Sequence, residues 1–278
     1  MTAHLPNMAG TAAAAAISVA PLFQYSTPQW LLLLSRISRT AVLYTEMLVA
    51  DHVIRRPEVI ASFRDVDPAC VHRMVPQLGG SDARVLGEAA RLCASHGFNK
   101  INFNVGCPSD RVRSGSFGCV LMKSPQTVVD AVRSMSDALG GGVSIKCRIG
   151  VDNDDSYAYF RDFVGDVALK SGATEFVVHA RKAWLHGVSP KYNRTVPPLR
   201  PEYVTRIKAE LPHLNFVLNG GLRSADDIRP YIGQVDGVMV GRAIMDSVWA
   251  LRDIEIGLGI DTFDTSRDAV LDEYSRTN

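Results

Sequence analysis

Short segments rich in β-branched and apolar residues recur along the chain and alternate with longer stretches of helical character. They predict eight strands, at Ile17–Phe23, Val42–Leu48, Met74–Gly80, Lys100–Pro108, Val143–Gly150, Glu175–Arg181, Asn215–Gly221 and Gly237–Ala243. Strands that alternate with helices in this number predict a (β/α)8 TIM barrel. A doubly wound open sheet is the alternative, but no GxGxxG follows the first segment, so its dinucleotide-binding form is not favoured.

Helix start and stop signals frame several of the intervening stretches. Ser81-Asp82 opens a run to His96, which Gly97 closes. Ser124-Pro125 opens a run to Leu139, which is followed by glycines. A shorter run begins at Ser224 and ends before Gly233. These signals favour helices between the strands and support the barrel prediction.

Polar residues share one face of several predicted strands, because successive strand side chains point to opposite faces. In the fifth segment Ser144, Lys146 and Arg148 share a face, and Cys147 lies on the other. The other segments add Glu46, Gln77, Asn102, Asn104, His179, Arg181 and Asn219. Helices cover the outer face of a barrel, so we expect this polar set to point inward. Its position near the carboxyl ends of the strands favours an active site over a group of satisfied core residues.

The stretch Asn102–Cys119 carries a candidate reactive thiol. Cys107 stands where a strand opens into a loop, between Gly106 and Pro108, and arginines follow at 111 and 113. A thiol on a rigid turn beside cationic side chains is a candidate proton donor or nucleophile. The alternative interpretation is a buried structural cysteine.

Glycines end the last two predicted strands, in Asn219-Gly220-Gly221 and in Gly241-Arg242. Loops at these places in a barrel often hold a phosphate through backbone amides. We therefore expect a phosphate-bearing cofactor or substrate here, with Lys146 and His179 facing the same ligand.

Composition narrows the remaining classes of protein. The net charge of the 278 residues is +1, so any binding to nucleic acid requires a local basic patch. The five cysteines form no CxxC pair, which favours a reducing compartment and predicts neither disulfides nor a metal site. The apolar run Trp30–Leu34 is too short to cross a membrane. Residues 1–16 hold an alanine tract without Lys or Arg, which predicts a disordered leader rather than a targeting signal.

Several motifs resemble those of the tRNA-dihydrouridine synthases, most closely the bacterial-type A subfamily. They are LYTEML, PQLGG, NVGCPSDRV, KCRIGVD, HARKAWLHGVSPKYNR, NGG and GVMVGRA, and they extend from about Ile17 to Arg242. The resemblance implies a TIM barrel over residues 17–258 that binds FMN and reduces uridine to 5,6-dihydrouridine in the tRNA D-loop, with NADPH as reductant. It also implies that residues 259–278 begin a truncated carboxy-terminal helical domain.

The resemblance assigns roles by position. Cys107 corresponds to the general acid of the family. The implied FMN contacts are the backbone of Pro21, Leu22 and Phe23, then Gln77, Lys146, His179, Asn219, Gly220, Gly221, Gly241 and Arg242. The implied tRNA contacts are Asn104, Lys191 and Arg194. In the implied reaction, reduced flavin delivers hydride to carbon six of a flipped-out uracil, and the thiol protonates carbon five.

Two features leave other functions open. Leu22 and Thr27 stand where the family carries methionine and aspartate, and the helical domain is cut short. They motivate a non-catalytic tRNA-binding remnant as one alternative, and a flavin barrel that acts on a free pyrimidine is another. The basic residues Arg181, Lys182, Lys191 and Arg194 favour RNA, because a free base needs no basic rim. We expect a cytoplasmic monomer with tRNA as its partner.

Overall fold

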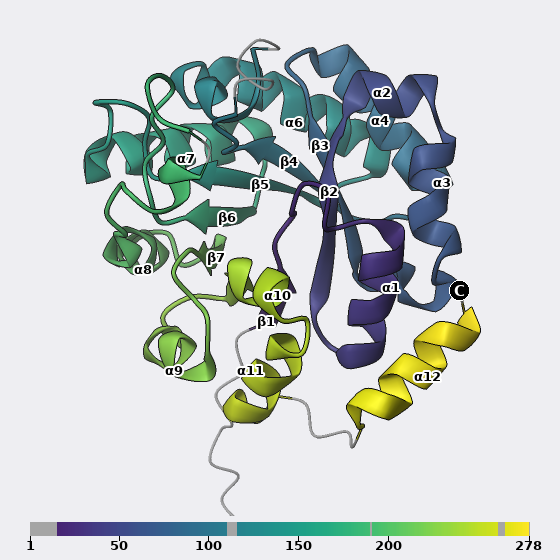
Figure 1. Cartoon of the computed structure of the whole chain (residues 1–278). Helices are drawn as coiled ribbons and strands as arrows, with labels where there is room; N and C mark the ends of the chain where they lie inside the picture. The colour runs from purple at the N-terminus through teal and green to yellow at the C-terminus, as the bar shows by residue number, and fades with distance from the viewer. Residues whose placement is uncertain (1–15, 110–115, 190, 261–264, 278) are drawn as a thin grey trace, which may run out of the picture.

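A closed barrel of parallel strands forms the centre of the structure, a computed structural model that describes residues 16–109, 116–189, 191–260 and 265–277 (Figure 1). The strands pair in chain order: β1 (Ala16–Val19), β2 (Val42–Val49), β3 (Met74–Gly79), β4 (Ile101–Val105), β5 (Val143–Arg148), β6 (Glu175–His179), β7 (Asn215–Asn219) and β8 (Gly237–Val240). The predicted TIM barrel is confirmed. Residues 1–15 of the predicted leader, and Arg111 and Arg113, lie outside the described residues.

Helices lie around the barrel in Figure 1. Their bounds are α1 (Pro28–Ile37), α2 (Ala50–Arg55), α3 (Glu58–Asp65), η1 (Pro68–Arg73), α4 (Ala83–Ser95), η2 (Gly118–Lys123), α6 (Pro125–Leu139), α7 (Tyr157–Ser171), η3 (Tyr192–Arg194), α8 (Pro201–Glu210), α9 (Ala225–Ile228), η4 (Arg229–Tyr231), α10 (Arg242–Asp246), α11 (Ala250–Leu258) and α12 (Arg267–Thr277). The sequence signals are confirmed at α4, where Asp82 accepts a hydrogen bond from the backbone N of Val85, and at α6, which ends at left-handed Gly140.

Two apolar layers hold the barrel together. The larger lies between strands and helices and includes Ile145 and Cys147 of β5, both fully buried. A smaller cluster, which includes Tyr44, Val177 and Met239, comes from the opposite strand faces and fills the interior. The interior below the mouth is therefore a packed core.

A network of buried polar side chains lies across β3, β4 and β5. Gln77 donates to Asn102 Oδ1 over 2.7 Å and accepts from Asn104 Nδ2 over 2.8 Å. Asn102 in turn donates to Ser144 Oγ over 2.9 Å. Each of the four is at most 7% exposed. Because these polar groups hydrogen-bond to one another, their burial costs little free energy. The same bonds confirm that the four side chains share the inward face.

Glu46 departs from the predicted inward set. The pairing of β2 with β3 shifts by one residue between Tyr44 and Met47, so Met47 rather than Glu46 lies opposite Gln77. The extra residue reverses the alternation of faces at this point. Glu46 instead accepts a hydrogen bond from the backbone N of Gln24 over 3.0 Å.

The last described helix packs on the outside of the barrel. Val270 of α12 is buried, and Glu273 lies 3.0 Å from Arg36 of α1. Among the described helices, none is long and apolar enough to cross a membrane.

Candidate functional site

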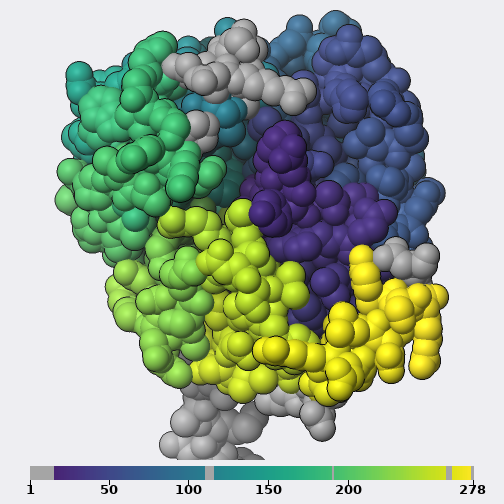
Figure 2. Space-filling view, in the orientation of Figure 1, coloured from purple at the N-terminus to yellow at the C-terminus, as the bar shows by residue number. Residues whose placement is uncertain are grey.

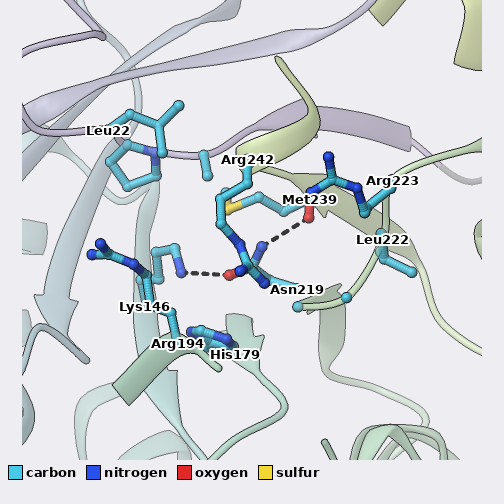
Figure 3. A pocket seen from close by; sticks show the side chains of 14 residues that line it. Leu22, Lys146, His179, Arg194, Asn219, Leu222, Arg223, Met239 and Arg242 are labelled. Atoms are coloured by element: carbon cyan, nitrogen blue, oxygen red, sulfur yellow. Dashed lines mark hydrogen bonds between the residues drawn. The ribbon is translucent and has the colours of Figure 1, made fainter. Parts of the chain in front are cut away.

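A pocket opens at the carboxyl ends of β1 and β5–β8 (Figure 3). Most of the predicted FMN contacts line it: Pro21, Leu22, Lys146, His179, Asn219, Gly220, Gly221, Gly241 and Arg242. Its wall does not include Phe23, whose side chain is 63% exposed, or Gln77, which is 1% exposed and hydrogen-bonded within the barrel. The carboxyl-end location thus follows the sequence prediction, with two exceptions.

Lys146 and Asn219 form a fixed pair at the floor of the pocket. Lys146 Nζ donates to Asn219 Oδ1 over 2.9 Å, and Asn219 Nδ2 donates to the carbonyl oxygen of Met239 over 2.8 Å (Figure 3). The second bond sets the orientation of the amide, which leaves its oxygen toward the lysine. An ammonium carries three donor protons, so Lys146 retains donors for a ligand.

The pocket is strongly cationic. Lys146, Arg194, Arg223 and Arg242 line it, and the lining residues within the described chain include no Asp or Glu. Arg223 is ion-paired with Asp246, which lies outside the lining. Burial, and next the charge of Arg148, lower the pKa of Lys146 to about 8. Cations crowded in this way repel one another, and an anionic ligand relieves that repulsion.

The environment of His179 favours its neutral form. Burial is the largest cause that lowers its pKa well below the usual range, followed by the charges of Arg148, Lys146, Arg181 and Arg242. A neutral imidazole donates from one ring nitrogen and accepts at the other. The histidine therefore offers hydrogen bonds rather than charge to a ligand.

Glycine is required in the loop after β7. Gly220 has φ +114°, and a Cβ there would lie 2.8 Å from His179 Cδ2. Gly221 has φ +78°, and its Cβ would lie 2.5 Å from Leu199 Cδ1. At both positions the backbone has a positive φ and neighbouring side chains leave no room for a Cβ. The main chain itself therefore forms this wall of the pocket. At Gly241 the nearest contact of an added Cβ is Ala20 at 3.5 Å, so no close packing requires that glycine.

Cys107 lies on the neighbouring loop, directly after β4. Asn104 Oδ1 accepts hydrogen bonds from the backbone N of Gly106 over 3.2 Å and of Cys107 over 3.0 Å. The backbone N of Cys119 donates to the carbonyl of Cys107 over 3.0 Å. The thiol lies 3.5 Å from Ser109 Oγ. These contacts fix the turn that carries the sulfur.

The other cysteines are unsuited to chemistry. Cys107 is half-buried, whereas Cys70, Cys93, Cys119 and Cys147 are buried. Burial raises the pKa of Cys93, Cys119 and Cys147 to about 12 in each case. A buried thiol with a raised pKa is inert, so the accessible candidate is Cys107.

Arg148 ties the loop of Cys107 to the loop that follows β6. Its side chain is 3% exposed. Nε donates to the carbonyl oxygen of Gly106 over 3.1 Å, and Nη1 donates to those of Lys182 and Asn193 over 3.1 and 2.8 Å. The sequence placed Arg148 on the inward face but gave no indication that it joins two loops.

The predicted tRNA contacts occupy three different environments. Asn104 is 7% exposed and is used to shape the turn of Cys107. Lys191 is exposed just before η3. Arg194 is exposed and also lines the pocket. Of the other basic residues, Arg181 donates to the carbonyl oxygens of Thr195 and Pro197, so it supports the loop from within.

Some lining residues were not predicted. They are Ala20, Leu222, Arg223 and Met239. Arg223 follows the Asn-Gly-Gly motif closely and lies on the same loop. Its nearness to that motif could have identified it as a lining residue. Met239 lies on the inward face of β8, and only the register of that strand reveals it.

The fold and the site together define a class: a (β/α)8 barrel with a pocket of glycine backbone and cations at its carboxyl end. Residues 18–258 match the family model described as Dihydrouridine synthase (Dus). The chain is 40% identical over 256 residues to the tRNA-dihydrouridine(20/20a) synthase of Salmonella typhi, covering 91% of this chain and 76% of the relative. It is 42% identical over 255 residues to the enzyme of the same name from Xanthomonas campestris pv. campestris, covering 91% and 75%. The chain therefore belongs to the dihydrouridine synthase family, a family of flavin-dependent oxidoreductases.

A solved structure of a complex of 2-naphthoyl-CoA reductase shares the fold. The TM-score is 0.68 at 8% sequence identity, and the match covers 87% of this chain and 50% of that chain. The chain thus spans about half of that reductase, and the similarity supports the barrel fold alone.

Proposed function

We propose that this protein reduces uridine to 5,6-dihydrouridine in the D-loop of tRNA, with FMN as cofactor and NADPH as the reductant. The observation that carries the proposal is the cationic pocket, with Lys146 and His179 in its wall and Cys107 on the next loop, in a chain of this family. The proposed organisation is a barrel over residues 17–258 followed by a helical segment that includes α12. We also expect a monomer in the cytoplasm.

The residues present fit a phosphate-bearing flavin. The backbone at Gly220 and Gly221 and the guanidinium group of Arg242 form a cationic end suited to a phosphate, beside Arg223, which is paired with Asp246. Lys146 and His179 supply donors to the polar edge of a ring. When bound, FMN would supply the two-electron redox chemistry that protein side chains lack.

The thiol of Cys107 is the proposed proton donor to carbon five of the uracil. Donation breaks the S–H bond and leaves a thiolate on Cys107. Asn104 and Arg148 hold the turn in place, so the sulfur does not have to be ordered during the reaction.

The direct test is an assay on RNA. The purified protein, FMN, NADPH and an unmodified tRNA transcript should yield dihydrouridine, detected by mass spectrometry of the digested nucleosides. Reduction of free uridine or oxidation of free dihydroorotate, without action on the transcript, would support the free-pyrimidine alternative instead. Transcript binding with neither reaction would support a non-catalytic protein.

The role of Cys107 is tested by separating the two half-reactions. Cys107→Ala should leave reduction of bound FMN by NADPH intact and slow its reoxidation by tRNA by about two to four orders of magnitude, the usual span of a general acid. Stopped-flow absorbance of the flavin measures both steps. Cys93→Ala, in α4 on the outside of the barrel, is the control and should leave both rates unchanged. Equal loss in both half-reactions for Cys107→Ala would show that the residue is structural.

A further inference from the structure

Exposed aromatic side chains gather at the mouth of the barrel. Among the described residues, the exposed large hydrophobic side chains are Phe23, Tyr25, Leu169, Tyr192, Val196, Ile256 and Leu271. The aromatic ones are Phe23, Tyr25 and Tyr192, which are 63%, 44% and 60% exposed. All three lie on two loops, the one between β1 and α1 and the one between β6 and α8. We call these three residues the aromatic rim.

Both loops form walls of the pocket. Leu22, next to Phe23, and Arg194, in the same helical turn as Tyr192, line it (Figure 3). In Figure 2 the purple segment after β1 and the green segment after β6 lie on the same face of the molecule, on either side of a hollow. The aromatic rim therefore borders the entrance through which a substrate must reach the pocket.

The β1–α1 loop is held in shape although its aromatic side chains are exposed. Ser26 Oγ accepts from the backbone N of Leu22 over 3.0 Å. Gln24 adopts a left-handed φ of +64°, and its backbone N donates to Glu46 over 3.0 Å. A left-handed non-glycine residue persists only where its surroundings support it. Phe23 and Tyr25 are thus presented outward by a fixed turn and are not withdrawn into the core.

The turn that carries Tyr192 is anchored from below. Asn193 is fully buried, and it donates to the carbonyl of Trp184 over 2.9 Å and accepts from the backbone N of Trp184 over 2.7 Å. Its own carbonyl accepts from Arg148 over 2.8 Å. Tyr192 and Lys191 project from this anchored turn into solvent.

Charge indicates which partner the aromatic rim meets. The exposed cations Lys191 and Arg194 adjoin Tyr192 on the same loop. An apolar protein partner has no need of those cations, and paired bases in a duplex have no free face to stack. Unpaired nucleotides have both a phosphate and a free π-face, and proteins bind them with this combination of cations and aromatic side chains.

We propose that the aromatic rim stacks on unpaired nucleotides next to the target uridine and holds the RNA loop open at the pocket. This inference rests on the proposed function and deepens it, because it assigns the side chains that hold the nucleotides around the target base. The stacked neighbours replace the stacking that the target base loses when it enters the pocket.

Kinetics on a tRNA transcript test the aromatic rim. Tyr25→Ala and Tyr192→Ala should each raise the KM for the transcript about five- to 150-fold, the effect of losing one base–aromatic stack. Reduction of the flavin by NADPH should not change. Leu169→Ala, a truncation of an 84% exposed side chain on α7, is the control and should leave the KM unchanged. An unchanged KM in both tyrosine variants overturns the proposal.

Side-chain chemistry separates stacking from general apolar contact. Tyr192→Phe should retain the KM of the parent protein, whereas Tyr192→Leu should resemble Tyr192→Ala. Full rescue by leucine overturns the proposal and indicates an apolar docking surface. Phe23→Ala should also raise the KM for the transcript, and an unchanged KM would contradict the place of Phe23 in the aromatic rim.

Fluorescence gives a readout that does not depend on turnover. A transcript with 2-aminopurine beside the target uridine should change its fluorescence on binding, and Tyr192→Ala should abolish that change. If no dihydrouridine forms but the fluorescence change is present and depends on Tyr192, the proposed function fails while the aromatic rim stands. If dihydrouridine forms and the fluorescence is the same in both proteins, the aromatic rim fails alone.

Discussion

At the scale of single residues, the mouth holds two cations, buried Arg148 and half-buried Lys146, whose hydrogen-bond partners among the described residues are neutral. Arg148 bonds to three backbone carbonyls, and Lys146 bonds to an amide oxygen. Neutral acceptors satisfy the hydrogen bonds of these cations without cancelling their charge. The charge is therefore retained for a ligand, at a cost in stability to the ligand-free protein.

Arg148 is predicted to act as a positioning residue for both mouth loops. Arg148→Lys keeps the charge, but a single ammonium cannot reproduce the planar fork that reaches Gly106, Lys182 and Asn193. Orphaned carbonyls should lower the free energy of unfolding by about 1–3 kcal/mol. We expect kcat for tRNA to fall while reduction of the flavin by NADPH is retained. Urea unfolding and stopped-flow absorbance measure these effects, and Arg64→Ala on exposed α3 is the control. Normal kcat in Arg148→Lys would mean that the charge alone matters.

The depressed pKa of Lys146 predicts a pH dependence. Its value in the ligand-free fold is about 8 against an ordinary 10.5, so the unfolded chain binds more protons between these values. The free energy of unfolding of the ligand-free protein should therefore rise with pH over that window. Anion binding favours the charged lysine, so affinity for FMN should fall as the pH rises above about 8, where the phosphate is already fully ionised.

Calorimetric titration of FMN at pH values on both sides of this pKa measures the effect. Lys146→Met should bind FMN more weakly and with little change across the same range. A pH dependence that is equally steep in Lys146→Met would assign it to another group.

At the scale of elements, periodicity predicted the strands and most of their inward faces, because both follow from local pattern. The strands begin and end within a few residues of the predicted bounds. The exceptions have nonlocal causes. Glu46 is turned aside by a register shift against β3, and Phe23 lies beyond the end of β1 on a turn held by Ser26 and Glu46. Pairing register and loop anchoring depend on contacts between distant segments, so one strand read alone does not reveal them.

The loop after β7 supplies a prediction at this scale. Gly220→Ala places a Cβ 2.8 Å from His179 and forces alanine to a φ of +114°, whereas Gly233→Ala also has a positive φ, +80°, but no atom within 4 Å. Both variants should lose more than about 1 kcal/mol of stability through backbone strain. Only Gly220→Ala should also lose FMN affinity, measured by flavin fluorescence. Equal affinity in both variants would show that this loop does not shape the cofactor site.

At the scale of the whole molecule, the net charge is small, so attraction for RNA depends on where the cations lie. The net charge is +1, and many surface cations are paired with nearby acids, as Lys170 is with Asp166 on α7. The exposed cations Lys191 and Arg194 instead stand on a loop that borders the pocket. Electrostatic attraction for RNA must therefore be local and directed to the mouth.

Salt dependence measures how local that attraction is. Each phosphate neutralised by a cation releases counterions, and the slope of log affinity against log salt changes by about 0.7–0.9 for each such contact. Lys191→Ala should reduce the slope for tRNA by this amount. Lys170→Ala removes a similarly exposed but paired cation from α7 and should leave the slope unchanged. Filter binding of a tRNA transcript over a range of salt concentrations gives both slopes. Equal slopes in the parent and in Lys191→Ala would remove that loop from the RNA interface, whereas an equal loss in both variants would show that attraction is spread over the whole surface.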